Sequence, residues 1–147
     1  MIDRQGRDKL AERLRHLVSG TISNYQFEDG EVRSSDPVIS EIEFRLAWPT
    51  YDDMHEHKLT GSRAITQGCR LDFARAILFL KSDFPYEWKS QKGIRGFLNS
   101  IFRLVTFTRK PLLDITEGDL QVWPFFRKSD YKAALTKPPY LHSPHVS

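Results

Sequence analysis

The stretch that decides the fold is CRLDFARAILFLKSDFPYEW, residues Cys69–Trp88. Its first part repeats apolar residues at helical spacing, and its second part gathers aromatic and acidic residues around a proline. With Thr66 as its N-cap, the first part predicts a central helix. Leu71, Leu78 and Phe79 fall outside the inward face of this helix, so we expect neighbouring elements to cover it on more than one side. The inward face itself consists of Cys69, Phe73, Ala76, Ile77 and Leu80.

Residues 3–19 predict an amphipathic helix near the start of the chain. Leucines recur on one of its faces, Asp3 serves as its N-cap, and Gly20 follows directly after its last residue. Arg7 and Arg13 fall among its polar positions. Because one face is apolar, we expect this helix to dock on another part of the protein.

The next segment, residues 21–32, allows two interpretations. The pair Asp29-Gly30 suits the turn of a β-hairpin, but the flanking strands would be short and would place two glutamates opposite each other. The alternative is a short helix capped by Ser23 or Asn24, packing back on the first helix. We adopt the helical interpretation.

One pattern runs from the first helix into the segment after it. It consists of Leu14, Leu17, Gly20, Ile22, Phe27 and Glu28. Residues 10–28 thereby resemble the SHOCT (short C-terminal domain) motif, in which a leucine-rich helix precedes a G-x-I-x-x-x-x-F-E turn and a second helix. The resemblance is confined to this segment, which lies near the start of the chain rather than at its C-terminal end. SHOCT segments are regarded as small oligomerisation or docking units, so the resemblance implies a contact role.

Ser35-Asp36-Pro37 predicts a third helix start, because proline suits the first helical position. Pro49 interrupts the apolar pattern that follows, so this helix stops or kinks near Trp48. The pattern then resumes and predicts a second helical segment over 51–61.

The C-terminal half predicts one long helix and an irregular region. Apolar residues at i, i+3 and i+4 predict a helix over 94–108. The aromatic run Val122–Phe126 is expected to lie extended against the bundle, and residues 130–135 predict one more short helix. Residues 141–147 are expected to form a flexible tail.

Composition bounds the class of protein. The 147 residues suit a single domain, with 39% apolar and 28% charged residues. A single cysteine excludes an internal disulfide, and no signal-like stretch opens the chain. The longest apolar run, Ala76–Leu80, is far too short to span a membrane. These observations predict a soluble cytoplasmic protein without membrane contact.

Charge is distributed unevenly along the chain. Residues 28–57 carry nine acidic and two basic side chains, a net charge of −7, whereas residues 58–110 carry eleven basic and three acidic ones, a net charge of +8. Such stretches either attract each other within the fold or leave the basic one to face an anionic partner. We favour attraction within the fold, because runs of charge are a weak sign of partners.

The densest group of potential metal ligands contains Asp53, His55 and His57. Imidazole and carboxylate groups suit Zn or Mn, but a metal site needs three or four of them to converge. On a helix, the two histidines would not face each other, and the spacing is not the H-E-x-x-H of zinc proteases. We therefore predict a polar, solvent-facing stretch, with no metal and no cofactor.

Asp83 and Glu87 are the candidate catalytic pair, because two carboxylates beside aromatic side chains can acquire different pKa values and act as acid and base. In the competing structural role, Asp83 turns the chain and Glu87 pairs with a cation of the basic stretch. The aromatic residues around Pro85 would then hold the segment to the core. We favour that role, and we expect Cys69, which lacks the local signature of a nucleophile, to be a buried packing residue.

The predicted partner-binding surface surrounds the same segment and consists of Arg75, Lys81, Asp83, Tyr86, Glu87, Trp88 and Arg95. The partner is another protein or a second copy of the chain. Nucleic acid is the alternative partner, because residues 58–110 are rich in Lys and Arg, although no known reader motif is visible.

Together these patterns predict a single all-α domain over residues 1–140, a compact bundle of about five helices with an irregular aromatic C-terminal segment. The lack of catalytic motifs, the uneven charge and the SHOCT-like segment predict a non-enzymatic interaction or accessory protein of bacterial type. A nucleic-acid-associated protein is the first alternative, and a small hydrolase or metal-dependent enzyme is the second.

Overall fold

The computed structural model describes residues 1–88 and 118–136. These two ranges contain five α-helices, four shorter helical turns and no strand, so the predicted all-α fold is confirmed. The predicted helix over 94–108, Arg95, and the tail 141–147 lie outside the described residues.

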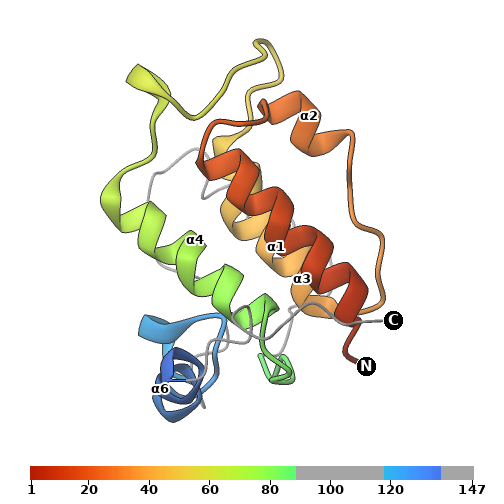
Figure 1. Cartoon of the computed structure of the whole chain (residues 1–147), viewed down its shortest axis with the longest axis vertical. Coiled ribbons are helices and arrows are strands. Elements are labelled where there is room, and N and C mark those ends of the chain that lie inside the picture. Colours follow the sequence, from red (N-terminus) through yellow and green to blue (C-terminus); the bar gives the residue numbers. More distant parts are fainter. Residues whose placement is uncertain (89–117, 137–147) are drawn as a thin grey trace, which may run out of the picture.

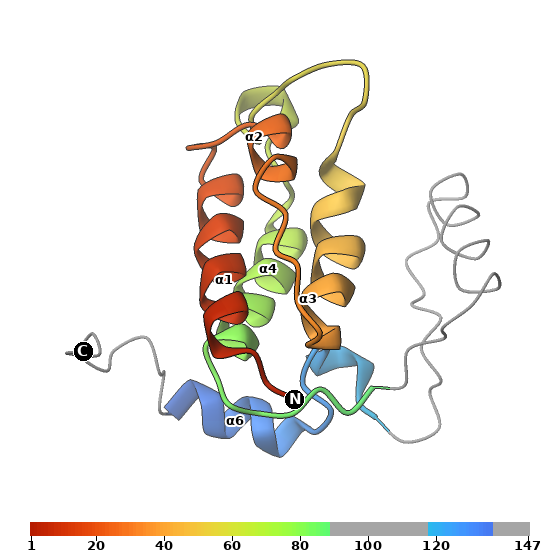
Figure 2. The same ribbon diagram turned by 90° about the vertical axis from the view of Figure 1, so that its right-hand side faces the viewer.

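Three helices form the body of the molecule (Figures 1 and 2), namely α1 (Arg4–Val18), α3 (Pro37–Ile42) and α4 (Gln67–Leu80). They run side by side, with α4 in the direction opposite to α1 and α3. The short helix α2 (Asn24–Glu28) lies at one end, and α6 (Lys128–Thr136) lies across the other end, near the N-terminus. The short helix predicted at 130–135 is thus confirmed as part of α6.

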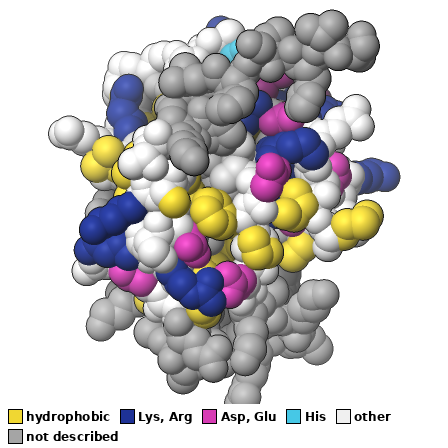
Figure 3. All heavy atoms as spheres, turned by 60° about the horizontal axis from the view of Figure 1, so that its bottom comes forward, with side chains coloured by type: hydrophobic (Ala, Val, Ile, Leu, Met, Phe, Trp, Pro, Cys, Tyr) yellow, Lys and Arg dark blue, Asp and Glu magenta, His cyan; other side chains and the backbone are white. Residues whose placement is uncertain are grey.

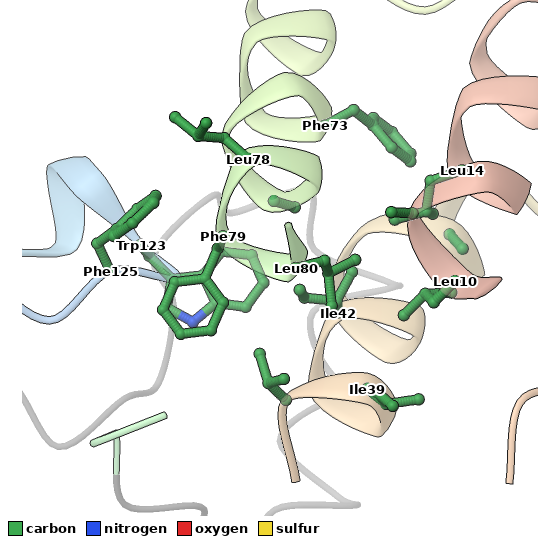
Figure 4. Packing of buried hydrophobic residues seen from close by; sticks show 14 of the residues in the cluster. Leu10, Leu14, Ile39, Ile42, Phe73, Leu78, Phe79, Leu80, Trp123 and Phe125 are labelled. Atoms are coloured by element: carbon green, nitrogen blue, oxygen red, sulfur yellow. The ribbon is translucent and has the colours of Figure 1, made fainter. Parts of the chain in front are cut away.

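The core lies between these helices (Figure 4). Its central side chains come from α1, α3 and α4 and are fully buried or nearly so: Leu10, Leu14, Ile39, Ile42, Phe73 and Leu80. Burying each such side chain contributes about 1.5–3 kcal/mol. Leu78 and Phe79 are buried as well, and Phe79 meets Phe125 edge-on with 5.0 Å between ring centroids. Helix α4 is therefore covered on more than one side, as predicted.

The first turns of α4 are more exposed than its end. Cys69 is only partly buried, so its expected role as a buried packing residue is wrong, and Leu71 is 59% exposed. The 3₁₀ turn η3 (Gly61–Arg63) and the residue after it are exposed. Because this connection offers little surface, the buried part of α4 begins only at Phe73.

The predicted ends of α1 and the helical interpretation of the next segment are confirmed. Asp3 caps α1 by accepting from the Gly6 N–H at 2.8 Å. Gly20 follows α1 with a φ of 73°, a left-handed conformation that glycine adopts without strain. Helix α2 begins after the N-cap Ser23, which forms a reciprocal capping box with Gln26. The hairpin alternative is therefore wrong.

The helix that begins with α3 changes its winding before Pro49. A π-helical turn, η1 (Glu43–Ala47), follows α3, and a 3₁₀ turn, η2 (Trp48–Thr50), contains the proline. In η1, the Trp48 N–H donates to the Glu43 carbonyl five residues back. Pro49 has no N–H to donate and would clash inside a regular helix, so the wider turn accommodates it. At the place where the sequence predicts a stop or a kink, the helix therefore changes from α-helical to π-helical and then to 3₁₀ winding.

Residues 51–60 do not form the predicted second helical segment. The buried Asn24 side chain donates to the carbonyl oxygens of Asp52 (3.1 Å) and His55 (3.2 Å). It also accepts from the His57 N–H at 2.7 Å. These bonds take backbone groups that a helix would use, so α2 holds this segment as a loop.

After α4 the chain continues as an aromatic segment, residues 82–88, at the end of the bundle where α6 lies (Figure 2). The buried Trp88 indole donates to the carbonyl oxygens of Pro124 (3.1 Å) and Phe125 (3.3 Å). The run Val122–Phe126 packs against the bundle, but it is not extended as predicted. The 3₁₀ turn η4 (Leu120–Val122) leads into it, and the Phe125 N–H donates to the Val122 carbonyl (2.9 Å), which closes a compact turn.

An ion pair is buried where α1, α3 and residues 82–88 meet. Arg7, predicted on the polar face of its helix, is fully buried, and its Nε donates to the carboxylate of Asp36 at 2.7 Å. The guanidinium also donates to the carbonyl oxygens of Ser82 (3.3 Å) and Phe84 (2.8 Å). Asp36 is the N-cap of α3, as predicted, so this pair joins three segments at one end of the bundle.

Candidate functional site

The segment 82–88 does not bring its two carboxylates into one site. Asp83 is exposed and pairs with Arg4 at 3.1 Å, whereas Glu87 binds Arg127 through two hydrogen bonds of 2.8 and 2.9 Å. Each carboxylate thus has a cation of its own. The structural interpretation expected Glu87 to pair with a cation of residues 58–110. Its partner is instead Arg127, the residue directly before α6.

The other described candidates for partner binding make contacts within the protein. Lys81 donates to the Asp8 carboxylate at 2.6 Å, and Arg75 donates to the carbonyl oxygen of Trp123 at 3.3 Å. Trp88 is buried. Tyr86 is largely buried as well, and its burial raises the pKa of its hydroxyl. Figure 3 shows the end of the bundle where these residues lie, and there basic and acidic side chains sit next to one another with hydrophobic ones between them.

The three candidate metal ligands, Asp53, His55 and His57, lie on the loop that α2 holds. Both ring nitrogens of His57 face backbone carbonyl oxygens, those of His55 (3.1 Å) and Thr50 (3.0 Å). The His55 ring is exposed and lies 3.5 Å from Asp52. Within residues 1–88 and 118–136, no three potential ligands gather around a common point.

A surface groove of about 530 Å³ lies away from the candidate residues that the sequence predicts. It lies between α2 with its following linker and the chain from Ser40 to Tyr51, which includes η1 and η2. Besides Ser40 and Ala47, the lining consists of four aromatic residues and four glutamates: Phe27, Phe44, Trp48, Tyr51, Glu28, Glu31, Glu41 and Glu43. We call it the acidic–aromatic groove.

Two of the four aromatic side chains of this groove, those of Phe44 and Trp48, are exposed. Trp48 stacks on Tyr51, with 5.4 Å between ring centroids and 12° between planes, and Tyr25 contacts Tyr51 in turn. Yet Trp48 is 47% exposed and Phe44 is 42% exposed. Large apolar side chains grouped in a surface depression are typical of a contact surface. The π-helical turn that carries Phe44 is itself a feature found frequently at functional sites.

The carboxylates of the groove differ in their surroundings. Burial raises the pKa of Glu43, against the effect of the hydrogen bond from the Val32 N–H, and the neighbouring Glu31 raises it further. The Tyr51 hydroxyl donates to Glu28, and this bond raises the pKa of Tyr51 to about 12. Glu28 and Glu43 thus accept hydrogen bonds from neutral donors, and Arg13 lies near enough to Glu43 to favour its ionised form.

The charge of the groove is only partly balanced. Glu41 pairs with Arg45 at 2.8 Å, and Glu31 lies 3.6 Å from a highly exposed Arg33. In the part of the chain that the structure describes, Glu28 and Glu43 form no ion pair. The groove therefore keeps an excess of negative charge next to its exposed aromatic rings.

The attraction expected between the acidic and basic stretches is limited in the described residues. One ion pair joins them there, between Arg63 and Asp52 at 3.0 Å. Six of the eleven basic residues of 58–110 lie outside the described ranges.

Two signals in the sequence could have pointed to the groove. Phe44 and Trp48 are spaced four residues apart and fall outside the apolar face formed by Ile39, Ile42 and Leu46. In addition, Pro49 follows them directly, where a regular helix cannot continue.

Comparisons with known proteins identify no relative of this chain. No protein-family model matches the chain, and no curated protein and no solved structure matches it. In the described residues, no helix has the length and hydrophobicity needed to cross a membrane.

Proposed function

We propose that this protein is a non-enzymatic interaction module that binds another protein through the acidic–aromatic groove. The observation that carries the proposal is the exposure of Phe44 and Trp48 together in this groove. Rings left in water forgo hydrophobic stabilisation that a partner surface can restore. An apolar centre with a charged border is also the usual composition of a protein interface.

Two further observations support this role. The carboxylates of residues 82–88 are tied in separate ion pairs within the chain, which counts against an acid–base pair in that segment. Phe27 and Glu28, which belong to the SHOCT-like pattern, line the groove. The resemblance implies a docking role for that segment, and the proposal gives this role a surface.

Peptide display tests the proposal without a known partner. A library of random peptides is selected on the immobilised full chain, and the enriched peptides are then measured against the double variant Phe44→Ala/Trp48→Ala. Because both side chains are exposed, we expect the variant to keep its circular dichroism spectrum and to lose the peptides.

Leu71→Ala is the matched control, since Leu71 is also large, apolar and exposed but lies on α4. We expect this variant to bind the enriched peptides as the wild type does. Peptides that bind the groove variant and the wild type equally would refute the proposal, and so would a selection that enriches nothing. Light scattering of the wild type and the groove variant at several concentrations shows whether a second copy binds and whether it needs Phe44 and Trp48.

A further inference from the structure

We infer that the acidic–aromatic groove recognises an arginine side chain in an exposed segment of its partner protein. This inference rests on the function proposed above and adds the chemistry of the ligand. It is carried by the combination of the exposed Trp48 side chain with the carboxylates of Glu28 and Glu43, which form no ion pair in the described residues.

The first step concerns charge. Glu28 and Glu43 line the groove, and their hydrogen bonds come from a neutral hydroxyl and a neutral backbone N–H. Glu31 lies close enough to Glu43 to oppose its ionisation, so like charges face the same space. A cation in that space would be attracted by several carboxylates at once, whereas an anionic partner such as nucleic acid would be repelled.

The second step concerns the aromatic wall. Tyr51 stacks on one face of the Trp48 indole, and the residue as a whole is still 47% exposed. Tryptophan gives the strongest cation–π attraction among the aromatic side chains. A planar guanidinium can lie flat on an indole and still direct its N–H donors sideways to carboxylates.

The chain itself uses this combination twice beside the groove. Arg45 bonds Glu41 at 2.8 Å and lies over the Trp123 ring at 5.9 Å. Arg13 lies over the Phe27 ring at 5.1 Å and near Glu43. Trp48 with Glu28 is a third such set, and no arginine of the described residues lies over the Trp48 ring. A partner's arginine would complete it.

The size of the groove favours a peptide segment. Its volume of about 530 Å³ falls within the range that accommodates a ligand larger than one side chain. The residues that flank the arginine would then contact Phe44, whose ring is 42% exposed. Lysine carries its charge at a single strongly hydrated point and cannot stack, so it fits this site less well.

The test uses the full chain and three fluorescein-labelled peptides of sequence Gly-Ser-X-Gly-Ser-X-Gly-Ser, with X as arginine, lysine or citrulline. Citrulline matches the shape of arginine but carries no charge. By fluorescence anisotropy at low ionic strength, we expect the arginine peptide to bind about tenfold tighter than the citrulline peptide and more tightly than the lysine peptide.

Variants of the protein locate the binding. Glu28→Gln/Glu43→Gln should weaken the arginine peptide about tenfold and leave the citrulline peptide unchanged. Glu87→Gln removes a negative charge at residues 82–88, outside the groove, and should leave binding unchanged. If this control weakens the arginine peptide as much as a groove substitution does, the attraction is only a long-range charge effect and the inference is wrong.

The outcomes separate the inference from the function on which it rests. If arginine and citrulline peptides bind equally while display-selected peptides still require Trp48, the groove binds proteins but does not recognise arginine. If neither the arginine peptide nor any selected peptide requires Trp48, both the inference and the proposed function fail.

Discussion

Replacing Arg7 by methionine removes a buried guanidinium while keeping much of the apolar stem. In the wild type, Nε lies 2.7 Å from the Asp36 carboxylate, and Nη1 lies 2.8 Å from the Phe84 carbonyl oxygen and 3.3 Å from that of Ser82. The substitution leaves Asp36, which is 2% exposed, without a counter-charge. It also leaves two carbonyl groups without this donor.

The expected loss follows from these contacts. Removing one partner of a buried ion pair costs about 3–5 kcal/mol. The Asp3 and Val38 N–H groups still reach Asp36, at 3.1 and 3.4 Å, and they moderate the loss. The cation–π contact of Arg7 with Phe79 at 5.2 Å is lost as well, worth about 1 kcal/mol. We therefore expect a decrease of about 4 kcal/mol in the free energy of unfolding, or about 8–16 °C in Tm.

A double-mutant cycle followed by urea unfolding and circular dichroism measures this loss. The cycle consists of Arg7→Met, Asp36→Asn and the double variant, and asparagine retains the N-cap of α3. Removing both charges leaves no buried ion unpaired, so the double variant should be about 2 kcal/mol more stable than the sum of the single losses predicts. If Arg7→Met costs less than about 1 kcal/mol, or if the two losses simply add, the pair does not hold this end of the bundle.

Three further predictions concern stability. Because burial raises the pKa of Glu43, its contribution to stability is present below its ordinary pKa of 4.5 and is lost as the pH rises through the raised value. Glu43→Gln should therefore resist urea better than the wild type at pH 7 and lose this advantage near pH 4, and a difference that does not change with pH would contradict the reasoning. A Cβ on Gly118 would lie 2.5 Å from the Trp88 indole, so Gly118→Ala should cost about 1–3 kcal/mol in urea unfolding. The control Gly68→Ala, where the nearest atom is 3.9 Å away, should cost nothing. Asn24→Ala should cost about 1–3 kcal/mol and speed hydrogen exchange at the His57 N–H, and unchanged exchange there would show that the loop does not depend on Asn24.

The sequence predicts the helix starts well because capping is a local property. Asp3, Ser23, Asp36 and Thr66 each accept a hydrogen bond from an N–H group only two or three residues ahead, and such spacing is visible in the sequence. A polar residue that becomes buried depends instead on a distant partner. Arg7 finds its carboxylate 29 positions away, so its place on a polar face gave no sign of its burial.

Whether the charges of the predicted site, residues 82–88, are already paired also depends on distant partners. Residues 82–88 combine acids and aromatics at high density, but density does not tell whether each charge is paired. Asp83 meets Arg4 79 positions away, and Glu87 meets Arg127 40 positions away. The groove, by contrast, combines residues 27–31 with residues 40–51, and a net charge counted over 28–57 cannot show that its acids share a space with aromatic rings.

The two ends of the bundle therefore differ in how they use charge. At the end near α6, Arg7 is buried with Asp36, and removing either charge destabilises the fold. At the groove, the burial of Glu43 is itself destabilising, and the exposed ring of Trp48 forgoes burial. A partner's cation would relieve both effects, so Glu43→Gln should raise the free energy of unfolding and, together with Glu28→Gln, weaken the arginine peptide. If the substitution stabilises the protein but the double variant binds the peptide like the wild type, the raised pKa of Glu43 reflects packing alone and the groove does not recognise arginine.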